Sequence, residues 1–140
     1  MDIKRVIAGL TFSLLMVNSA TVGAVMLHDS YSCEVRSAQH VGEDGSLVPD
    51  EFGNWMYSGA TFVIDRQTGR MLGKPKNYNG NDQPEVIDRG SKEQSLKVIT
   101  TYGPNVTIDY LIVEVYADTL AKPFMFISSS TIYTGLCKGL

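Results

Sequence analysis

From residue 30 to its end the chain is a succession of short runs rich in β-branched and aromatic residues, separated by Gly, Asn, Pro or Asp. This pattern is typical of strands joined by tight turns. We predict strands at 30–38, 60–66, 70–74, 85–89, 96–102, 108–117, 124–128 and 132–138. Eight short sequential strands favour an all-β fold, a small antiparallel meander closed into a barrel. A two-sheet sandwich is the alternative.

One run identifies a core face. In 108–117, Leu111, Val113, Val115 and Ala117 alternate with more polar positions. Because successive side chains of a strand point to opposite faces of the sheet, these four residues share one face. We predict that this face lies in the core.

The connection over 41–59 is long for a compact domain, and long connections are often functional. Pro49, followed by Asp50 and Glu51, favours the start of a helix, and Gly53 limits it to one turn at most. The connection also carries three aromatic residues, which we predict to be binding residues: Phe52, Trp55 and Tyr57.

The N-terminus has the pattern of a secretory signal peptide. Lys4 and Arg5 precede a mostly apolar stretch over 6–17, and small residues follow up to Ala24. The apolar stretch is shorter than the roughly 20 residues that a membrane-spanning helix needs. We predict cleavage after Ala24, with Ala20 as the alternative. We also predict a single β-domain over 25–140, and a periplasmic or secreted protein without a membrane span.

Two cysteines, Cys33 and Cys137, lie near the two ends of the predicted domain. An exported pair is exposed to oxidising conditions and normally forms a disulfide. We predict that the bond joins the first and last strands, which would be neighbours in a closed barrel.

The charge balance argues against nucleic acid as a partner. The chain has 12 basic and 15 acidic residues, and removing 1–24, with Asp2, Lys4 and Arg5, leaves 10 and 14, a net charge near −4. An acidic domain without basic clusters lacks the electrostatic footprint of a nucleic-acid-binding protein. Its charge instead favours cationic partners.

The tetrapeptide Val-Ile-Asp-Arg occurs twice, at 63–66 and 86–89, each time just ahead of a glycine. Asp65 and Asp88 could form the carboxylate pair of a glycosidase, which requires them to converge in a cleft. Each aspartate is instead followed by an arginine and a turn. We therefore predict two solvated strand ends.

No other motif predicts catalysis. The chain has no G-x-S-x-G elbow and no glycine-rich phosphate loop, and its two histidines are too few for a metal set. We predict His40 to be a loop residue and His28 to lie in a disordered start. The predicted protein has no catalytic residue, metal or cofactor and is not an enzyme.

Three short stretches, "YSCEV" at 31–35, "SGATF" at 58–62 and "TGLC" at 134–137, resemble the periplasmic C-type lysozyme inhibitors. Those small antiparallel barrels insert the serine of an S-G-x-x-Y loop into the lysozyme cleft and use a lysine further along the chain. The resemblance implies these roles for Ser58, Gly59 and Lys74, although Phe62 stands in place of the tyrosine. It covers about a dozen residues and assigns no family.

Together these features predict a non-catalytic binding module of the cell envelope that recognises a protein or a small apolar ligand. Inhibition of c-type lysozyme is one alternative. Carriage of a small lipophilic ligand inside the barrel is the other.

Overall fold

The computed structural model describes residues 25–140, so the predicted signal peptide lies outside the described residues. All eight predicted strands are present, but the strand predicted over 108–117 ends at Val113, and residues 114–117 form a turn. One short additional strand and one helix complete the fold. The elements are β1 (Ser30–Val41), β2 (Leu47–Pro49), α1 (Glu51–Tyr57), β3 (Thr61–Asp65), β4 (Met71–Gly73), β5 (Glu85–Arg89), β6 (Leu96–Tyr102), β7 (Thr107–Val113), β8 (Ala121–Ser128) and β9 (Thr131–Gly139).

Helix α1 differs from its prediction. It has seven residues, about two turns, and Pro49 does not begin it but ends strand β2. Asp50 is the N-cap, and its side chain accepts a hydrogen bond from the Gly53 backbone N–H. A capping carboxylate satisfies a helical N–H that has no partner within the helix, so the helix starts after Asp50. A search of residues 25–140 finds no helical segment that could span a bilayer.

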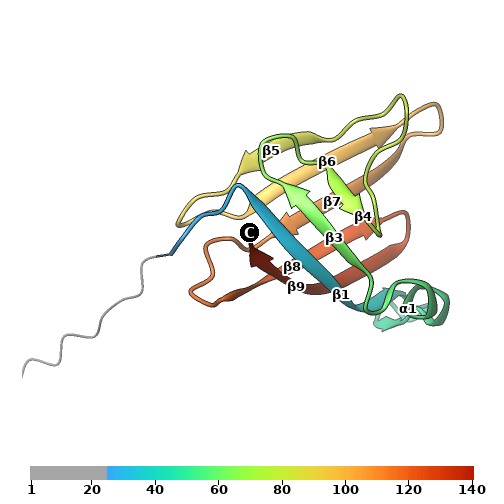
Figure 1. The fold of residues 1–140 in the computed structure, drawn as a ribbon. Helices are drawn as coiled ribbons and strands as arrows, with labels where there is room; N and C mark the ends of the chain where they lie inside the picture. The colour runs from blue at the N-terminus through green and yellow to red at the C-terminus, as the bar shows by residue number, and fades with distance from the viewer. Residues whose placement is uncertain (1–24) are drawn as a thin grey trace, which may run out of the picture.

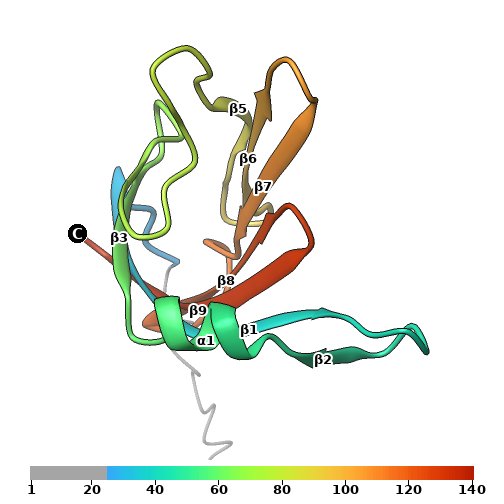
Figure 2. The same cartoon turned by 90° about the vertical axis from the view of Figure 1, so that its right-hand side faces the viewer.

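The strands form one antiparallel sheet in the order β4-β3-β1-β9-β8-β7-β6-β5, with β2 paired to β1. The sheet curls into a half-barrel, with β1, β9 and β8 at its base and β3 and β7 on its two sides (Figures 1 and 2). A single continuous sheet excludes the sandwich alternative. The predicted closure into a full barrel is only half achieved.

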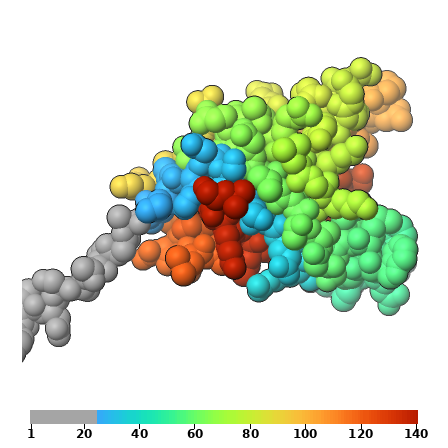
Figure 3. Space-filling model, viewed as in Figure 1, coloured from blue at the N-terminus to red at the C-terminus, as the bar shows by residue number. Residues whose placement is uncertain are grey.

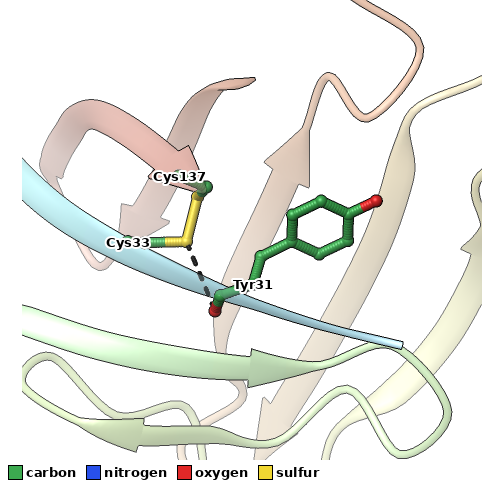
Figure 4. The surroundings of a disulfide bond; sticks show 3 residues. All are labelled: Tyr31, Cys33 and Cys137. Carbon is green, nitrogen blue, oxygen red and sulfur yellow. Dashed lines mark hydrogen bonds between the residues drawn. A yellow bond between two sulfur atoms is a disulfide. The ribbon is translucent and has the colours of Figure 1, made fainter. Parts of the chain in front are cut away.

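The first and last long strands lie at the centre of the sheet. Strands β1 and β9 pair from Tyr31 opposite Gly139 to His40 opposite Thr131. Cys33 and Cys137 lie directly opposite each other in this ladder and form the predicted disulfide (Figure 4). The first and last strands are therefore neighbours, as predicted, and the half-barrel is open between the consecutive strands β4 and β5 instead.

The two edge strands, β4 and β5, are consecutive in the sequence, and the described residues form no ladder between them. Side chains bridge this seam instead. The buried Asn77 amide accepts a hydrogen bond from Met71 N–H at 2.9 Å and donates one to Gly69 O at 2.8 Å. The Thr100 hydroxyl of β6 donates to the Asn77 carbonyl at 2.7 Å. The 74–84 connection thereby ties the two edges together.

The inward faces of the strands supply one hydrophobic cluster. Its largest fully buried apolar side chains are those of Tyr31, Phe62, Phe126, Ile64, Met71, Leu96, Leu111, Val35, Val98, Val113 and Val115. The predicted core face is therefore confirmed at Leu111, Val113 and Val115, while Ala117 is only partly buried. Burial of these side chains is the main stabilising contribution to the fold.

His28 is ordered, contrary to its prediction. Its ring packs edge-on against Tyr31 with centroids 5.7 Å apart, and its Nδ1 lies 3.2 Å from the Leu140 carbonyl oxygen. The Arg66 guanidinium also donates to the His28 carbonyl oxygen at 3.1 Å. These contacts hold the segment that precedes β1 against the C-terminal end of the chain.

Candidate functional site

Helix α1 is fastened directly to β1. Gly53 is buried, and a Cβ at this position would lie 2.9 Å from the Ala38 Cβ. The neighbouring Asn54 side chain accepts a hydrogen bond from Ala38 N–H at 2.7 Å and donates one to Ala38 O at 2.9 Å. The side-chain amide of Asn54 therefore bonds the backbone of Ala38 as a neighbouring strand would. This docking fixes which face of the helix points away from the sheet.

The N-cap adds a second attachment. Asp50 accepts hydrogen bonds from Gly53 N–H at 2.9 Å and from the Thr131 hydroxyl of β9 at 2.8 Å. The Gly53 N–H, followed by the Thr131 hydroxyl, holds the pKa of the Asp50 carboxyl below its usual value. Asp50 is thus an ionised structural cap.

The opposite side of α1 is an exposed apolar surface, which we name the α1 face: Phe52, Trp55 and Met56. Their exposed fractions are 64%, 79% and 42%. The spacing i, i+3, i+4 places them on one side of the helix. The Phe52 and Trp55 rings are 5.9 Å apart. A cluster of exposed large apolar side chains is a common mark of an interaction site.

The structure separates the predicted binding residues into two groups. Tyr57 turns inward and packs edge-on against Tyr133 with centroids 5.2 Å apart, so it does not belong to the α1 face. Ser58 is the exposed C-cap of α1. The exposed Lys74 lies close to it in the fold, because Lys74 N–H donates to Thr61 O at 3.0 Å at the start of β3. Ser58 and Lys74 therefore lie at the same end of the β3–β4 hairpin.

Sequence reasoning missed Met56. Met56 follows Phe52 by four residues, a spacing that places both side chains on one side of a helix. This spacing would have identified Met56 only if the helix had been predicted over 51–57. Gly53 suggested a shorter helix. In the structure this glycine serves instead as the contact point with β1.

Helix α1 and the β1–β2 hairpin form a lobe that projects from the half-barrel (Figures 2 and 3). Its charge has one sign. Between residues 41 and 59 there are four acidic residues and no lysine or arginine, and Glu43, Asp44 and Glu51 are exposed. The α1 face is thus an apolar surface on an acidic lobe.

The two Val-Ile-Asp-Arg segments end in turns of similar chemistry. Asp65 accepts hydrogen bonds from Gln67 N–H at 3.0 Å and Thr68 N–H at 2.7 Å, and the contacts with Thr68 lower the pKa of Asp65. Asp88 accepts from Gly90 N–H at 2.8 Å. Glycine follows with a positive φ of 71° at residue 69 and 76° at residue 90. Each carboxylate thus accepts hydrogen bonds within the turn that follows its own strand, which agrees with the prediction of two strand ends.

One buried carboxylate lies elsewhere in the half-barrel. Asp109, 7% exposed, accepts a hydrogen bond from the Tyr102 hydroxyl at 2.7 Å. Burial, and then this contact with Asp109, raises the pKa of Tyr102. Among residues 25–140, no three His, Cys, Asp or Glu side chains gather as a metal site would require.

Comparisons with known proteins find no matching family, no similar curated protein and no similar solved structure.

Proposed function

We propose that this protein is a non-catalytic binding module of the cell envelope and that the α1 face is its docking surface. The observation that carries the proposal is the exposure of Trp55 on a helix fastened to the sheet by Asn54 and Gly53. An aromatic side chain held on a rigid element loses little entropy when a partner covers it. Such residues are frequent hot spots of protein interfaces.

The acidic lobe defines the chemistry of the partner. Glu51 is exposed on α1 itself, and Glu43 and Asp44 are exposed at the tip of the β1–β2 hairpin, while the 41–59 segment has no lysine or arginine. A complementary protein would present an apolar pocket bordered by basic side chains. The proposed partner is therefore a cationic protein.

Export remains part of the proposal. The described domain has its two cysteines joined in a disulfide, the usual state in an oxidising compartment. The N-terminal pattern over 1–24 favours secretion. These two features support a periplasmic or secreted location, and mass spectrometry of the exported protein tests it by locating the new N-terminus.

Replacing Trp55 with alanine is expected to weaken partner binding about 30-fold or more, the equivalent of about 2 kcal/mol for an interface hot spot. Since the side chain is 79% exposed, the fold should be unaffected. Proteins cross-linked to the wild type in envelope extract would be identified, and the affinity of the captured protein for each variant would then be measured by calorimetry.

Ile87→Ala is the matched control, because Ile87 is 57% exposed on the distant edge strand β5. It should bind like the wild type. Binding should also weaken as ionic strength rises from about 0.01 M to about 1 M, where the screening length falls from about 30 Å to about 3 Å. Equal affinity of the captured protein for Trp55→Ala and for the wild type would contradict the proposal.

A second candidate function is inhibition of c-type lysozyme. The observation that favours it is the placement of Ser58 and Lys74, 16 residues apart in sequence, at the same exposed end of the β3–β4 hairpin. This placement is compatible with the roles that the resemblance implies for the serine and the lysine.

Micromolar protein is expected to slow the lysis of bacterial cell walls by c-type lysozyme if this second function holds. Lys74→Ala should then abolish the slowing, whereas Lys92→Ala, which removes an exposed lysine from another connection, should not. Undiminished lysis in the presence of the wild-type protein would contradict this function.

Carriage of a lipophilic ligand inside the barrel is less well supported, since the inward side chains pack together in one buried cluster.

A further inference from the structure

A second surface feature lies on the side of the molecule away from α1. An open depression of about 700 Å³ is lined by residues of three segments: the start of the described chain, the connection after β7, and the end of β9. The start of the described chain lies on the opposite side of the molecule from α1 (Figure 1). Its size is within the range of small-molecule sites, about 300–1,000 Å³. The docking surface proposed above does not include it.

Part of the lining is apolar and accessible. Leu120 is 96% exposed and Met26 is 69% exposed, and Val25 lies beside them. Leu120 is the most exposed large hydrophobic side chain among residues 25–140. Covering these side chains with a hydrocarbon chain would remove apolar area from water, which favours binding.

The same depression contains a buried cation. Lys122 is only 6% exposed, and its ammonium donates one hydrogen bond to the Ala117 carbonyl oxygen. A lysine ammonium has three N–H donors, and no other acceptor for them is found in the described part of the chain. A buried charge is costly to leave incompletely paired, so this group is suited to an anionic ligand atom.

The surrounding charges keep a positive balance. Lys138 also lines the depression, and neither lysine has a carboxylate within 4.0 Å among residues 25–140. Asp118 is the one acidic residue of the lining, and it is exposed. His28 is held in place by its contacts with Tyr31 and Leu140. Among the lysine and acidic side chains of the lining, two are cations and one is an exposed carboxylate, and this balance favours an anionic ligand over a cationic one.

We propose that this depression binds a free fatty acid, with the carboxylate on the Lys122 ammonium and the alkyl chain across Leu120 and Met26. A neutral alkyl chain would leave the lysine without its second partner, and a cationic amphiphile would meet like charge. A simple inorganic anion would leave the apolar lining in water. The single-chain anionic amphiphile satisfies both parts of the lining.

The test titrates the purified protein with dodecanoate, dodecanol and dodecyltrimethylammonium, each kept monomeric, by calorimetry. We expect one molecule of dodecanoate to bind and the other two probes to bind at least tenfold more weakly. Lys122→Met should lower the affinity for dodecanoate at least tenfold, whereas Lys92→Met, which removes an exposed lysine elsewhere, should leave it unchanged.

Lys122 is buried, so a loss of binding in Lys122→Met has to be distinguished from a disturbed fold, and Leu120→Ser provides the second variant. Leu120 is 96% exposed, so this change cannot open the core, and it should weaken dodecanoate binding at least threefold. Absence of dodecanoate binding would overturn the proposal. Equal affinity for the three probes, or wild-type affinity in Leu120→Ser, would overturn it as well. Trp55→Ala should bind dodecanoate with wild-type affinity. A failure of the proposed docking function of the α1 face would therefore leave this result unchanged.

Discussion

Replacing Cys33 and Cys137 together with alanine is expected to lower the free energy of unfolding by about 4.7 kcal/mol, the chain-entropy value for a closed loop of about 100 residues. The two cysteines are 104 residues apart, so the bond restricts almost the whole described domain in the unfolded state. Small domains have a net stability of about 5–15 kcal/mol, and this loss would remove a large part of it. Urea unfolding of the wild type and the double variant measures the difference.

Reduction of the wild-type protein is the control. It breaks the same bond and adds only one hydrogen atom to each sulfur, so the side chains keep nearly the same volume. Both sulfur-bearing side chains are buried between β1 and β9, at 1% and 0% exposure. Reduced wild type and double variant should therefore unfold at similar urea concentrations, both well below the oxidised protein. A difference under about 1 kcal/mol between oxidised and reduced protein would show that the entropic account fails here.

Gly135→Ala is expected to destabilise the domain by about 3 kcal/mol, the upper part of the usual range for overpacking. A Cβ at residue 135 would lie 2.0 Å from the Glu34 carbonyl oxygen of β1 and 2.7 Å from the Phe124 ring of β8. The first contact is with backbone, so β1 and β9 would have to separate where they pair at the centre of the sheet. Phe124 would also lose its edge-on contact with Phe62.

Gly80→Ala is the matched control, since a Cβ at that exposed position meets nothing within 4 Å. Its midpoint of urea unfolding should stay close to that of the wild type. The midpoint of Gly135→Ala should fall clearly below both. Equal midpoints for the two variants would contradict the prediction. They would show that strands β1 and β9 can move apart without a loss of stability, although protein interiors are closely packed.

The strands were predictable because their signals are local. Alternation in 108–117 identified the buried face at Leu111, Val113 and Val115, and turn residues marked the ends of the runs. The disulfide was predictable from the cysteine count and the secretory pattern. The acidic character of the 41–59 segment and the aromatic residues Phe52 and Trp55 could also be read directly from the sequence.

The extent of α1 was not predictable from local signals. A helix of seven residues is too short to be stable alone, because its few hydrogen bonds do not offset the unfavourable free energy of helix nucleation. It forms here because Asn54 binds the backbone of Ala38 and Gly53 allows close contact with β1. Those contacts join residues 16 positions apart in the sequence.

The amino-acid sequence by itself determined an all-β chain, the positions of eight strands and the pairing of its two cysteines, since all of these follow from residue type and spacing. Only the tertiary structure decided that β1 and β9 meet at the centre of one half-barrel, and that Trp55 faces solvent while Tyr57 packs against Tyr133. It also brought Met26, Leu120 and Lys122 around one depression. The physical reason is that long-range strand pairing and helix docking depend on the packing energy of the whole chain, which no local pattern contains.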